Sequence, residues 1–520
     1  MNIILFISNA VAFAFLLIYH MHMYQLNSYN NIEEKIWMRE NSYPIFGRIF
    51  GLVISLILLA VFNNFVPIIG YVLAIILNIL TALGNREKES KIALKYTPRV
   101  KRMMFTATLM YIIINLLSYY ILNILNLTNL YKFIMQITPM FNQYLLMTAN
   151  FLNTPIERQI NNKFINEARQ KIKSMPNLTV IGVTGSYGKT TVKQILGKLL
   201  AKDFNVLITP YNYNTTLGVT ITIREYLSPL HDVFICEMGA KGVGEIKEIC
   251  DIVNPKYGVI TSIGEQHLET FLSVDNIIKT KFELADAVPD DGMVFLNYDN
   301  EIIRNKKLDK NIVSYAVDYK NADFVPYDIK VDENGSIFYL DIDGEKVKFE
   351  TKIIGLHNVL NIAGCIAVAY KLGVTRQTLV QRVRQIEQVE HRQQVIKKNF
   401  GIIIDDAYNS NPSGAKSALD TLSMFDMLKI VITPGMVELG EKQSSLNREF
   451  GRQIAKMADY TILVGKNQTI PIQDGIREEN YDEEKLFIVD DIKEALNIAY
   501  KLKSEKQKAI LLENDLPDNY

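Results

Sequence analysis

The pattern of apolar and polar residues changes at about residue 152. Long uncharged stretches dominate before this point, at residues 2–19 and 49–83, whereas short apolar runs alternate with charged segments after it. About 20 apolar residues in a helix span a hydrocarbon core of about 30 Å. The pattern therefore predicts an α-helical multispan membrane domain followed by a soluble α/β region.

The first part of the chain contains about five candidate spans. Residues 2–19 form the first, and a cleavable signal peptide is the less favoured alternative, because no basic segment precedes the apolar run. Polar residues interrupt 49–83, which predicts two spans joined by a tight turn. A fourth candidate covers 104–124. The fifth, 132–152, carries several polar residues, so it crosses the bilayer, re-enters it or lies along its surface.

A basic segment sets the expected orientation. Residues 85–102 hold seven lysines or arginines, and basic loops stay on the cytoplasmic side of a membrane. A cytoplasmic soluble region after residue 155 then requires an even number of crossings after this segment. We therefore expect the fifth candidate to cross the membrane and the N-terminus to lie outside. Contact of the basic segment with an anionic lipid-linked substrate is the alternative.

Composition excludes some functions. The 520 residues are enough for about three domains. Lysine and arginine total 56, equal to aspartate and glutamate, so no overall charge favours nucleic acid and we expect no nucleic-acid partner. Cys236, Cys250 and Cys365 lie far apart without zinc-site spacing, which predicts free core cysteines in a reducing compartment.

A loop with two glycines carries the first chemical signal. "VTGSYGKTTV", residues 183–192, follows the apolar run "LTVIG" and precedes a helical pattern. Gly185 and Gly188 let backbone N–H groups approach phosphate oxygens. Lys189 adds a positive charge, and the Thr190 hydroxyl suits Mg²⁺ at a helix N-terminus. The strand, loop and helix together predict a nucleotide-phosphate site.

This loop resembles that of one ligase family. Val183 stands where the general P-loop has a glycine, and the sequence is similar instead to the shorter T-G-x-x-G-K-T loop of the Mur ligases, which use ATP to form amide bonds in peptidoglycan precursors. The chain most resembles the D-alanyl-D-alanine-adding branch, over about residues 176–465. Four more motifs occur in the family's order: "EMGAKGVGEI" (237–246), "TSIGEQHLETF" (261–271), "GLHNVLN" (355–361) and "DDAYNSNP" (405–412).

The resemblance implies a fold and a domain order. A P-loop domain with a doubly wound, mostly parallel sheet precedes a smaller C-terminal, Rossmann-like α/β domain. The alternation of apolar strands with helices in this sequence agrees with that fold. The expected parts are a membrane domain with about five transmembrane or re-entrant helices, a helical stalk, a central ATP-binding domain and a C-terminal domain, at residues 1–155, 156–176, 177–388 and 389–520.

The chemistry that the resemblance implies joins a carboxylate to an amine. The γ-phosphate of ATP moves to the carboxylate, and the amine attacks the acyl phosphate, while two Mg²⁺ ions neutralise charge. The implied catalytic residues are Lys189, Glu237, His267, Lys281 and Arg392, and the implied metal ligands are Thr190, Glu237, His267 and Lys281. The implied phosphate loop comprises Gly185, Ser186, Gly188, Lys189, Thr190 and Thr191.

For His267 and Lys281, the sequence also allows a role other than metal binding. A single histidine after a strand, such as His267, is often structural. Lys281 falls where many family members carry a lysine carbamylated by CO₂, but Lys279 leaves the position uncertain by two residues. A solvated lysine on the helix surface is the alternative for Lys281.

Further positions match the family's nucleotide and substrate contacts. Asn297 would contact adenine, although an asparagine before a turn is common anyway. Asn358 would lie beside the nucleotide or cap a helix. Asn214 matches a contact to the carboxylate substrate, and Thr215 stands where close relatives have a second asparagine. A turn-rich loop is the alternative for 405–412. The remaining implied nucleotide-side residues are Asn361, Arg392, Asp406, Tyr408, Asn409 and Asn411.

Two regions depart from the family's pattern. The adding enzymes begin with a soluble domain that holds a uridine nucleotide, and candidate membrane spans stand in its place here. The chain also ends in "ILLENDLPDNY" where the adding enzymes have a basic K-G-S-R segment. Glu513, Asp515 and Asp518 would favour a positively charged or differently shaped amine, unless this acidic segment is a frayed tail.

The predicted function is that of a membrane-anchored, ADP-forming carboxylate–amine ligase in the bacterial cytoplasmic membrane, with its catalytic domains in the cytoplasm. Tethering raises the effective concentration near a membrane-bound acceptor, here a lipid-linked or nascent glycan carboxylate, and the second substrate is a small amine. One alternative is a cytoplasmic ligase that adds D-Ala-D-Ala to a UDP-MurNAc peptide. Another is a nucleotide-driven membrane switch or transporter, which the lack of a charge relay in the spans disfavours.

Overall fold

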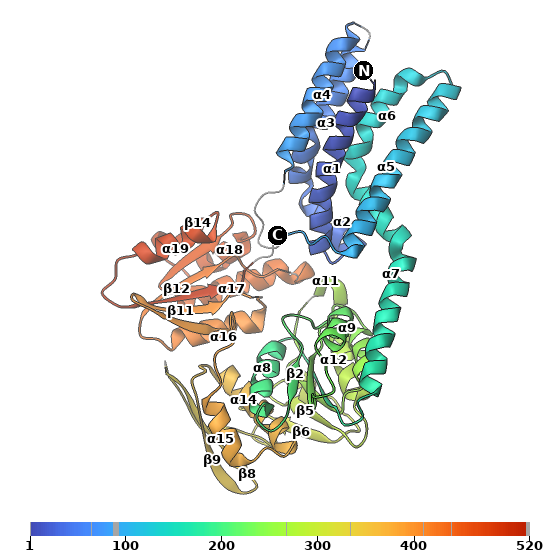
Figure 1. Cartoon of the computed structure of the whole chain (residues 1–520). Coiled ribbons are helices and arrows are strands. Elements are labelled where there is room, and N and C mark those ends of the chain that lie inside the picture. The colour runs from blue at the N-terminus through green and yellow to red at the C-terminus, as the bar shows by residue number, and fades with distance from the viewer. Residues whose placement is uncertain are drawn as a thin grey trace. The chain divides into compact units, whose positions relative to one another are not determined.

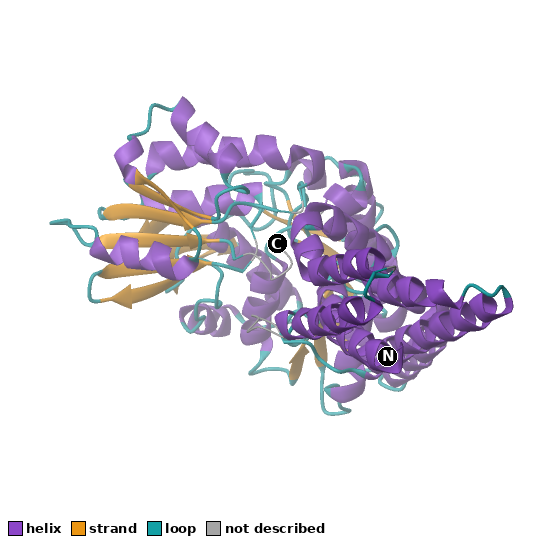
Figure 2. Ribbon diagram, turned by 90° about the horizontal axis from the view of Figure 1, so that it is seen from above, coloured by secondary structure: helices purple, strands orange, loops and turns teal. Residues whose placement is uncertain are grey.

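The computed structural model places the chain in two compact units, one formed by the residues up to Asn162 and one running from Lys163 to Leu516. Figures 1 and 2 show helices in the first unit and helix-covered sheets in the second. The described residues are 2–63, 65–86, 93–266, 268–332, 334–408, 410–437 and 439–515.

The first unit is built from long helices. Four of them, α1, α3, α4 and α5, are long and apolar enough to cross a membrane by length and composition. The fifth candidate span of the sequence is a broken helix, in which the short η2 joins α6 to α7. The elements are α1 (Asn2–Leu26), α2 (Asn31–Glu40), α3 (Ser42–Phe62), α4 (Pro67–Gly84), α5 (Pro98–Ile124), η1 (Thr128–Leu130), α6 (Tyr131–Ile137), η2 (Thr138–Phe141) and α7 (Asn142–Lys173).

Local sequence explains where two of these helices begin. Pro67 stands in the first turn of α4 and Pro98 in the first turn of α5, where the missing N–H of proline leaves no hydrogen bond unmade. The Thr97 side chain accepts a hydrogen bond from the backbone N–H of Val100 and caps α5. The uncharged stretch 49–83 is therefore split into two helices, as its polar interruption predicts.

A neutral polar network lies inside the first unit. Asn78 of α4 donates to Ser8 at 3.1 Å and exchanges hydrogen bonds with Gln136 of α6. Asn9 of α1 donates to Gln136 and accepts from the Tyr111 hydroxyl of α5 at 2.6 Å. All five side chains are buried. Interhelical hydrogen bonds of this kind hold apolar helices in one register, because lipid offers polar groups no other partner.

The broken helix runs from one end of the first unit to the other. At its start, Tyr131 packs against Tyr119 near the end of α5, with ring centroids 5.3 Å apart. Further along, Glu157 of α7 makes a two-point ion pair with Arg102 in the first turns of α5, at 2.7 and 2.9 Å. The chain thus returns to the end of the unit where the described part of the basic segment lies, and a fifth membrane crossing remains a prediction.

The second unit begins with a six-stranded parallel sheet, in the order β2-β3-β1-β4-β5-β6. This confirms the predicted doubly wound, mostly parallel sheet. Its strands are β1 (Thr179–Thr184), β2 (Val206–Ile208), β3 (Val233–Glu237), β4 (Tyr257–Ile260), β5 (Met293–Asn297) and β6 (Ile312–Tyr315). The helices are α8 (Lys189–Leu200), α9 (Thr216–Glu225), α10 (Glu245–Val253), α11 (Leu268–Phe271), α12 (Val274–Ala287), α13 (Glu301–Arg304), α14 (Leu356–Lys371) and α15 (Arg376–Arg384).

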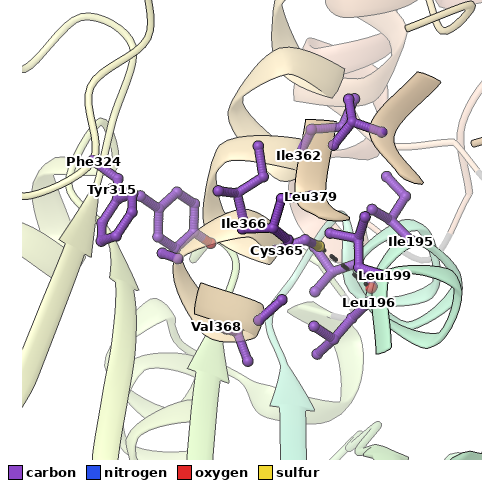
Figure 3. Packing of buried hydrophobic residues seen from close by; sticks show 14 of the residues in the cluster. Ile195, Leu196, Leu199, Tyr315, Phe324, Ile362, Cys365, Ile366, Val368 and Leu379 are labelled. Atoms are coloured by element: carbon purple, nitrogen blue, oxygen red, sulfur yellow. Dashed lines mark hydrogen bonds between the residues drawn. The ribbon is translucent and has the colours of Figure 1, made fainter. Parts of the chain in front are cut away.

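A small antiparallel sheet, in the order β7-β8-β9, follows β6. Its strands are β7 (Tyr327–Asp332), β8 (Gly335–Ile342) and β9 (Glu345–Thr351). Figure 3 shows how α14 packs against α8, with Cys365 beside Leu196 and Leu199. This apolar contact holds the helix that begins at Lys189 firmly in the core. Cys365, Cys236 and Cys250 are free and buried, which confirms their prediction as core residues.

The chain ends in a second, smaller α/β domain, as predicted. Its sheet has the order β10-β11-β15-β12-β13-β14, in which only β10 runs antiparallel to its neighbour. The strands are β10 (Gln394–Lys398), β11 (Gly401–Asp406), β12 (Leu428–Thr433), β13 (Tyr460–Val464), β14 (Leu486–Val489) and β15 (Lys508–Glu513). The helices are α16 (Pro412–Ser423), η3 (Gly440–Lys442), α17 (Gln443–Met457), α18 (Ile470–Glu478), η4 (Glu483–Lys485) and α19 (Ile492–Lys501).

Candidate functional site

The loop between β1 and α8 has the backbone of a phosphate cradle. Gly185 and Gly188 have φ angles of 151° and 81°, a region that side chains rarely adopt. A Cβ atom on Gly185 would lie 2.1 Å from the hydroxyl oxygen of Thr261. The Ser186 hydroxyl donates to the carbonyl of Gly264 at 3.0 Å. The loop is therefore fixed against the segment after β4, with its N–H groups at the start of a buried helix.

Lys189 folds back over this loop. Its ammonium donates to the carbonyls of Gly185 and Ser186, at 2.7 and 3.2 Å. Burial lowers its pKa to about 8, and the nearby carboxylate of Glu237 opposes this shift. A phosphate group in the cradle would offer the ammonium a stronger, charged acceptor than two carbonyls. The position of Lys189 suits the phosphate contact that the sequence predicts.

Glu237, the last residue of β3, is the polar centre of the site. Its Oε1 accepts hydrogen bonds from the Thr190 hydroxyl and from the Asn214 amide, both at 3.1 Å. Its Oε2 lies 2.9 Å from the ammonium of Lys193. Burial alone would raise the pKa of Glu237, but Lys193 and Lys189 hold it below its usual value. A charged carboxylate beside a hydroxyl is a donor set that fits Mg²⁺.

Lys193 is the residue that sequence reasoning missed. It belongs to α8, three residues after Thr190, and its side chain is fully buried. The signal was present, because Lys193 stands between Val192 and Ile195 on the apolar face that packs into the core. A lysine on such a face requires a buried acceptor, and the sequence alone did not show which one.

Lys281 is buried in α12, whereas Lys279 is exposed. Burial lowers the pKa of Lys281 to about 7, and the charge of Lys189 adds to this effect. Its ammonium lies 5.7 Å from the ring centroid of Phe271, and we find no hydrogen-bond or ion-pair partner for it among the described residues. A neutral amine in this setting is the form that reacts with CO₂. His267, the other candidate for a second metal, lies outside the described residues.

The three asparagines assigned to the nucleotide have different surroundings. The Asn297 amide donates to the Thr261 carbonyl, and its oxygen accepts from the N–H of Asp299, which is an ordinary turn bond. Asn358 donates to the carbonyl of Ile354 from inside the first turn of α14, so the expectation that it caps this helix is wrong; Gly355 takes that place. Asn361 lies against the phosphate loop, with its Oδ1 3.2 Å from the position of a Cβ on Gly188.

Arg392, Asp406 and Tyr408 come together at the start of the second sheet. The Arg392 guanidinium lies over the Tyr408 ring, 4.2 Å from its centroid. Burial raises the pKa of Asp406 to about 6, although Arg392 opposes the shift. The charge of Arg392 also contributes, after burial, to the lowered pKa of Lys189. The ATP contacts that the family's motif implies for these three residues remain predictions.

Two other predicted contact residues serve as helix caps. Thr215 accepts a hydrogen bond from the N–H of Gly218 and caps α9. Asn411 accepts from the N–H of Gly414 and caps α16. Thr191 follows Thr190 in α8 and is half-buried. Substrate or nucleotide contacts of these residues remain predictions, and Asn409 lies outside the described residues.

Glu513 is not part of a frayed tail, and that interpretation is wrong. It is the last residue of β15, it is 1% exposed, and it contacts the hydroxyls of Ser410 and Thr433. Burial raises its pKa to about 8. Its carboxyl group is thus neutral and hydrogen-bonded near neutral pH, at the carboxyl end of an inner strand of the sheet. Asp515 is exposed, and Asp518 lies outside the described residues.

Comparison with known families agrees with this geometry. Residues 183–369 match the model of the Mur ligase middle domain, and residues 391–513 match that of the Mur ligase, glutamate ligase domain. The two matches together cover more than half of the chain and include the phosphate loop, Glu237 and Arg392. The chain belongs to the Mur ligase family. The helical first unit precedes the part of this Mur ligase that the family models match.

Individual relatives of this Mur ligase are similar in the same region. The UDP-N-acetylmuramoyl-tripeptide–D-alanyl-D-alanine ligase of Bacillus subtilis is 29% identical over 53% of this chain and 60% of its own length. That of Escherichia coli is 27% identical over 59% of this chain and 69% of its own. The chain therefore spans only about three fifths of the length of the Bacillus relative.

Solved structures resemble this Mur ligase in fold. MurF from Acinetobacter baumannii has a TM-score of 0.62 and 26% identity, covering 68% of this chain and 77% of that one. MurF ligase from Thermotoga maritima in complex with ADP has a TM-score of 0.61 and 25% identity, covering 68% and 80%. The recognition of a Mur ligase from five motifs is thereby confirmed, together with the fold.

Proposed function

We propose that this Mur ligase is a membrane-anchored, ATP-dependent enzyme that activates a glycan carboxylate and couples it to a small amine. The observation that carries the proposal is the convergence of Thr190, Asn214 and Lys193 on Glu237, next to the phosphate loop. Thr190 and Glu237, which can bind Mg²⁺, therefore lie beside Asn214, which can contact the acceptor carboxylate. The ADP found in the Thermotoga relative supports a nucleotide in this place.

The residues divide the work of the reaction. Lys189 and the loop N–H groups hold the β- and γ-phosphates of ATP, and Thr190 with Glu237 holds Mg²⁺, which supplies positive charge at the transferring phosphoryl group. Asn214 presents the acceptor carboxylate. A carboxylate oxygen bonds to the γ-phosphorus as the bond to ADP breaks. The amine nitrogen then bonds to the acyl carbon, phosphate leaves with the acyl oxygen, and the amine releases a proton.

The apolar first unit supports an acceptor at the membrane. Its four long apolar helices offer an anchor, and the Arg102–Glu157 pair ties α7 to the basic end of the unit. We propose that this end faces the bacterial cytoplasm, where ATP is available, and that the acceptor is a lipid-linked or nascent envelope glycan. Tethering then raises the local concentration of enzyme near the acceptor.

The names of the relatives favour a second candidate. The Bacillus and Escherichia proteins are D-alanyl-D-alanine ligases that act on a UDP-N-acetylmuramoyl-tripeptide. This chain would catalyse the same addition if its acceptor were soluble and nucleotide-linked. The helical first unit is the feature that argues for the membrane-bound acceptor instead.

The test is ADP release by the detergent-purified full chain with ATP, Mg²⁺ and a membrane lipid extract, while amines are added one at a time and Lys189→Ala serves as the blank. Turnover that requires both the lipid extract and one amine supports the proposal. Turnover that requires UDP-MurNAc-tripeptide and D-Ala-D-Ala selects the second candidate. ADP release that ignores every acceptor and amine overturns both and indicates a nucleotide-driven switch or pump.

The membrane arrangement can be checked with single cysteines. The three native cysteines are buried, so they give little background. We expect Phe65→Cys, in the exposed turn between α3 and α4, to react with a membrane-impermeant maleimide in intact cells. Lys95→Cys, in the basic segment, should react only after permeabilisation. The opposite pattern would place the ATP site outside the cell and contradict the proposal.

A further inference from the structure

We infer that Lys193 is a positioning residue that locks the acceptor-side loop, residues 209–214, onto Glu237 and thereby fixes the Mg²⁺-binding carboxylate. The inference deepens the proposed function, because it rests on Glu237 as a metal ligand and on Asn214 as an acceptor contact. It assigns Lys193 no contact with ATP or with the acceptor. Lys193 affects Mg²⁺ binding through its contacts with Glu237 and the loop.

The Lys193 ammonium lies close to three oxygen atoms, two from the loop and one from Glu237. It donates to the carbonyl of Thr209 at 2.9 Å and to that of Tyr211 at 3.0 Å. The carboxylate of Glu237 lies 2.9 Å away. Two contacts therefore go to the loop and one goes to the metal-binding side chain. The Lys193 ammonium therefore connects the loop to Glu237, and the buried helix α8 fixes the position of Lys193.

The loop and the end of β3 are joined by further bonds around this lysine. The backbone N–H of Glu237 donates to the Thr209 hydroxyl at 3.1 Å, and the N–H of Gly239 donates to the carbonyl of Asn214 at 2.6 Å. A Cβ on Gly239 would lie 2.9 Å from the Asn214 side chain, so the glycine lets Asn214 lie close. The Asn214 amide can then reach Glu237.

Burying a lysine this completely is costly unless its charge is paired. An apolar residue at this buried position of α8 would avoid that cost. The presence of a lysine at position 193 is thus better explained by its contacts with the loop and Glu237 than by a contribution to stability. Without its charge, the Glu237 carboxylate would turn toward other donors, and the loop would lose two of its anchors.

The test compares Lys193→Met with Lys198→Met in the full chain. Lys198 lies on the same helix, but it is exposed and paired with Glu387 at the surface, so it is the matched control. The readouts are binding of a fluorescent ADP analogue during a Mg²⁺ titration and hydrogen exchange of the amides in 209–214. Neither readout requires an acceptor or an amine, so a failure of the ligase proposal does not affect them.

We expect Lys193→Met to weaken the apparent Mg²⁺ affinity of the nucleotide complex by about tenfold or more, as loss of a partner to a metal ligand does. Exchange in 209–214 should rise, while nucleotide binding in EDTA stays unchanged. Lys193→Arg, which keeps the charge, should restore most of the Mg²⁺ affinity. A Lys193→Met protein with unchanged Mg²⁺ affinity and unchanged exchange would overturn the inference.

A second pair of variants covers the case in which Lys193→Met does not fold. Glu237→Gln and Glu237→Gln/Lys193→Met both lack the carboxylate, so the double variant leaves no unpaired buried charge. If the amides of 209–214 exchange faster in the double variant than in Glu237→Gln alone, Lys193 stabilises the loop as inferred. Equal exchange in the two proteins contradicts it.

Discussion

Replacing Lys189 with alanine lowers the rate of ADP formation by about 10²- to 10³-fold, the range typical for removal of one preorganised charge from a transition state. The ammonium lies over the phosphate loop, bonded to the carbonyls of Gly185 and Ser186. It is therefore poised to follow the γ-phosphate as negative charge moves onto the bridging oxygen. The measurement is steady-state ADP release at saturating ATP, acceptor and amine.

Lys198→Ala provides the comparison for this prediction. It also removes one positive charge from α8, but at an exposed ion pair, which contributes little to stability. We expect its turnover to match that of the wild type. If Lys189→Ala retained more than half of the wild-type rate, the loop would not be the phosphate site.

We propose that Lys281 is carbamylated and binds a second metal ion. On this proposal, replacing Lys281 with alanine lowers turnover by about 100-fold, because the metal loses an oxygen ligand. The carbamate forms when the neutral amine takes up CO₂ and releases a proton. The pKa of Lys281, lowered to about 7 by burial, leaves the amine neutral above that pH. Wild-type activity should therefore fall in CO₂-free buffer and return with bicarbonate, most completely above pH 7.

Lys279→Ala is the control for this effect, since Lys279 lies two residues earlier on the exposed face of the same helix. It should keep wild-type turnover and the same response to bicarbonate. Mass spectrometry of the intact wild-type protein under native conditions should show an added mass of CO₂ that Lys281→Ala lacks. Activity that does not change with bicarbonate would contradict the carbamylation of Lys281.

The fold was largely predictable because its signals are local. Apolar runs ending in glycine or charged residues mark the strands, and the order of motifs along the chain places the phosphate loop after β1 and Glu237 at the end of β3. Parallel strands then bring these two ends to one edge of the sheet. Proximity of Thr190 to Glu237 follows from that rule without any knowledge of side-chain contacts.

The parts of the site that were missed depend on contacts between distant segments. Nothing near Lys193 in the sequence shows that its ammonium meets the carbonyls of Thr209 and Tyr211. Glu513 looked like part of an acidic tail, because its partners are distant in sequence: Ser410 lies in the loop after β11 and Thr433 ends β12. Such partners are set by sheet order, which the local pattern does not contain.

On the proposal that the first unit spans the membrane, its polar network bears on how the protein would respond to a membrane potential. Ser8, Asn9, Asn78, Tyr111 and Gln136 are all uncharged. Moving one elementary charge through 100 mV involves about 2.3 kcal/mol, but a neutral network offers the field no such charge to move. These interhelical hydrogen bonds should therefore keep the helices in the same register in a resting and a depolarised cell. Helix packing in the first unit should not depend on the membrane potential.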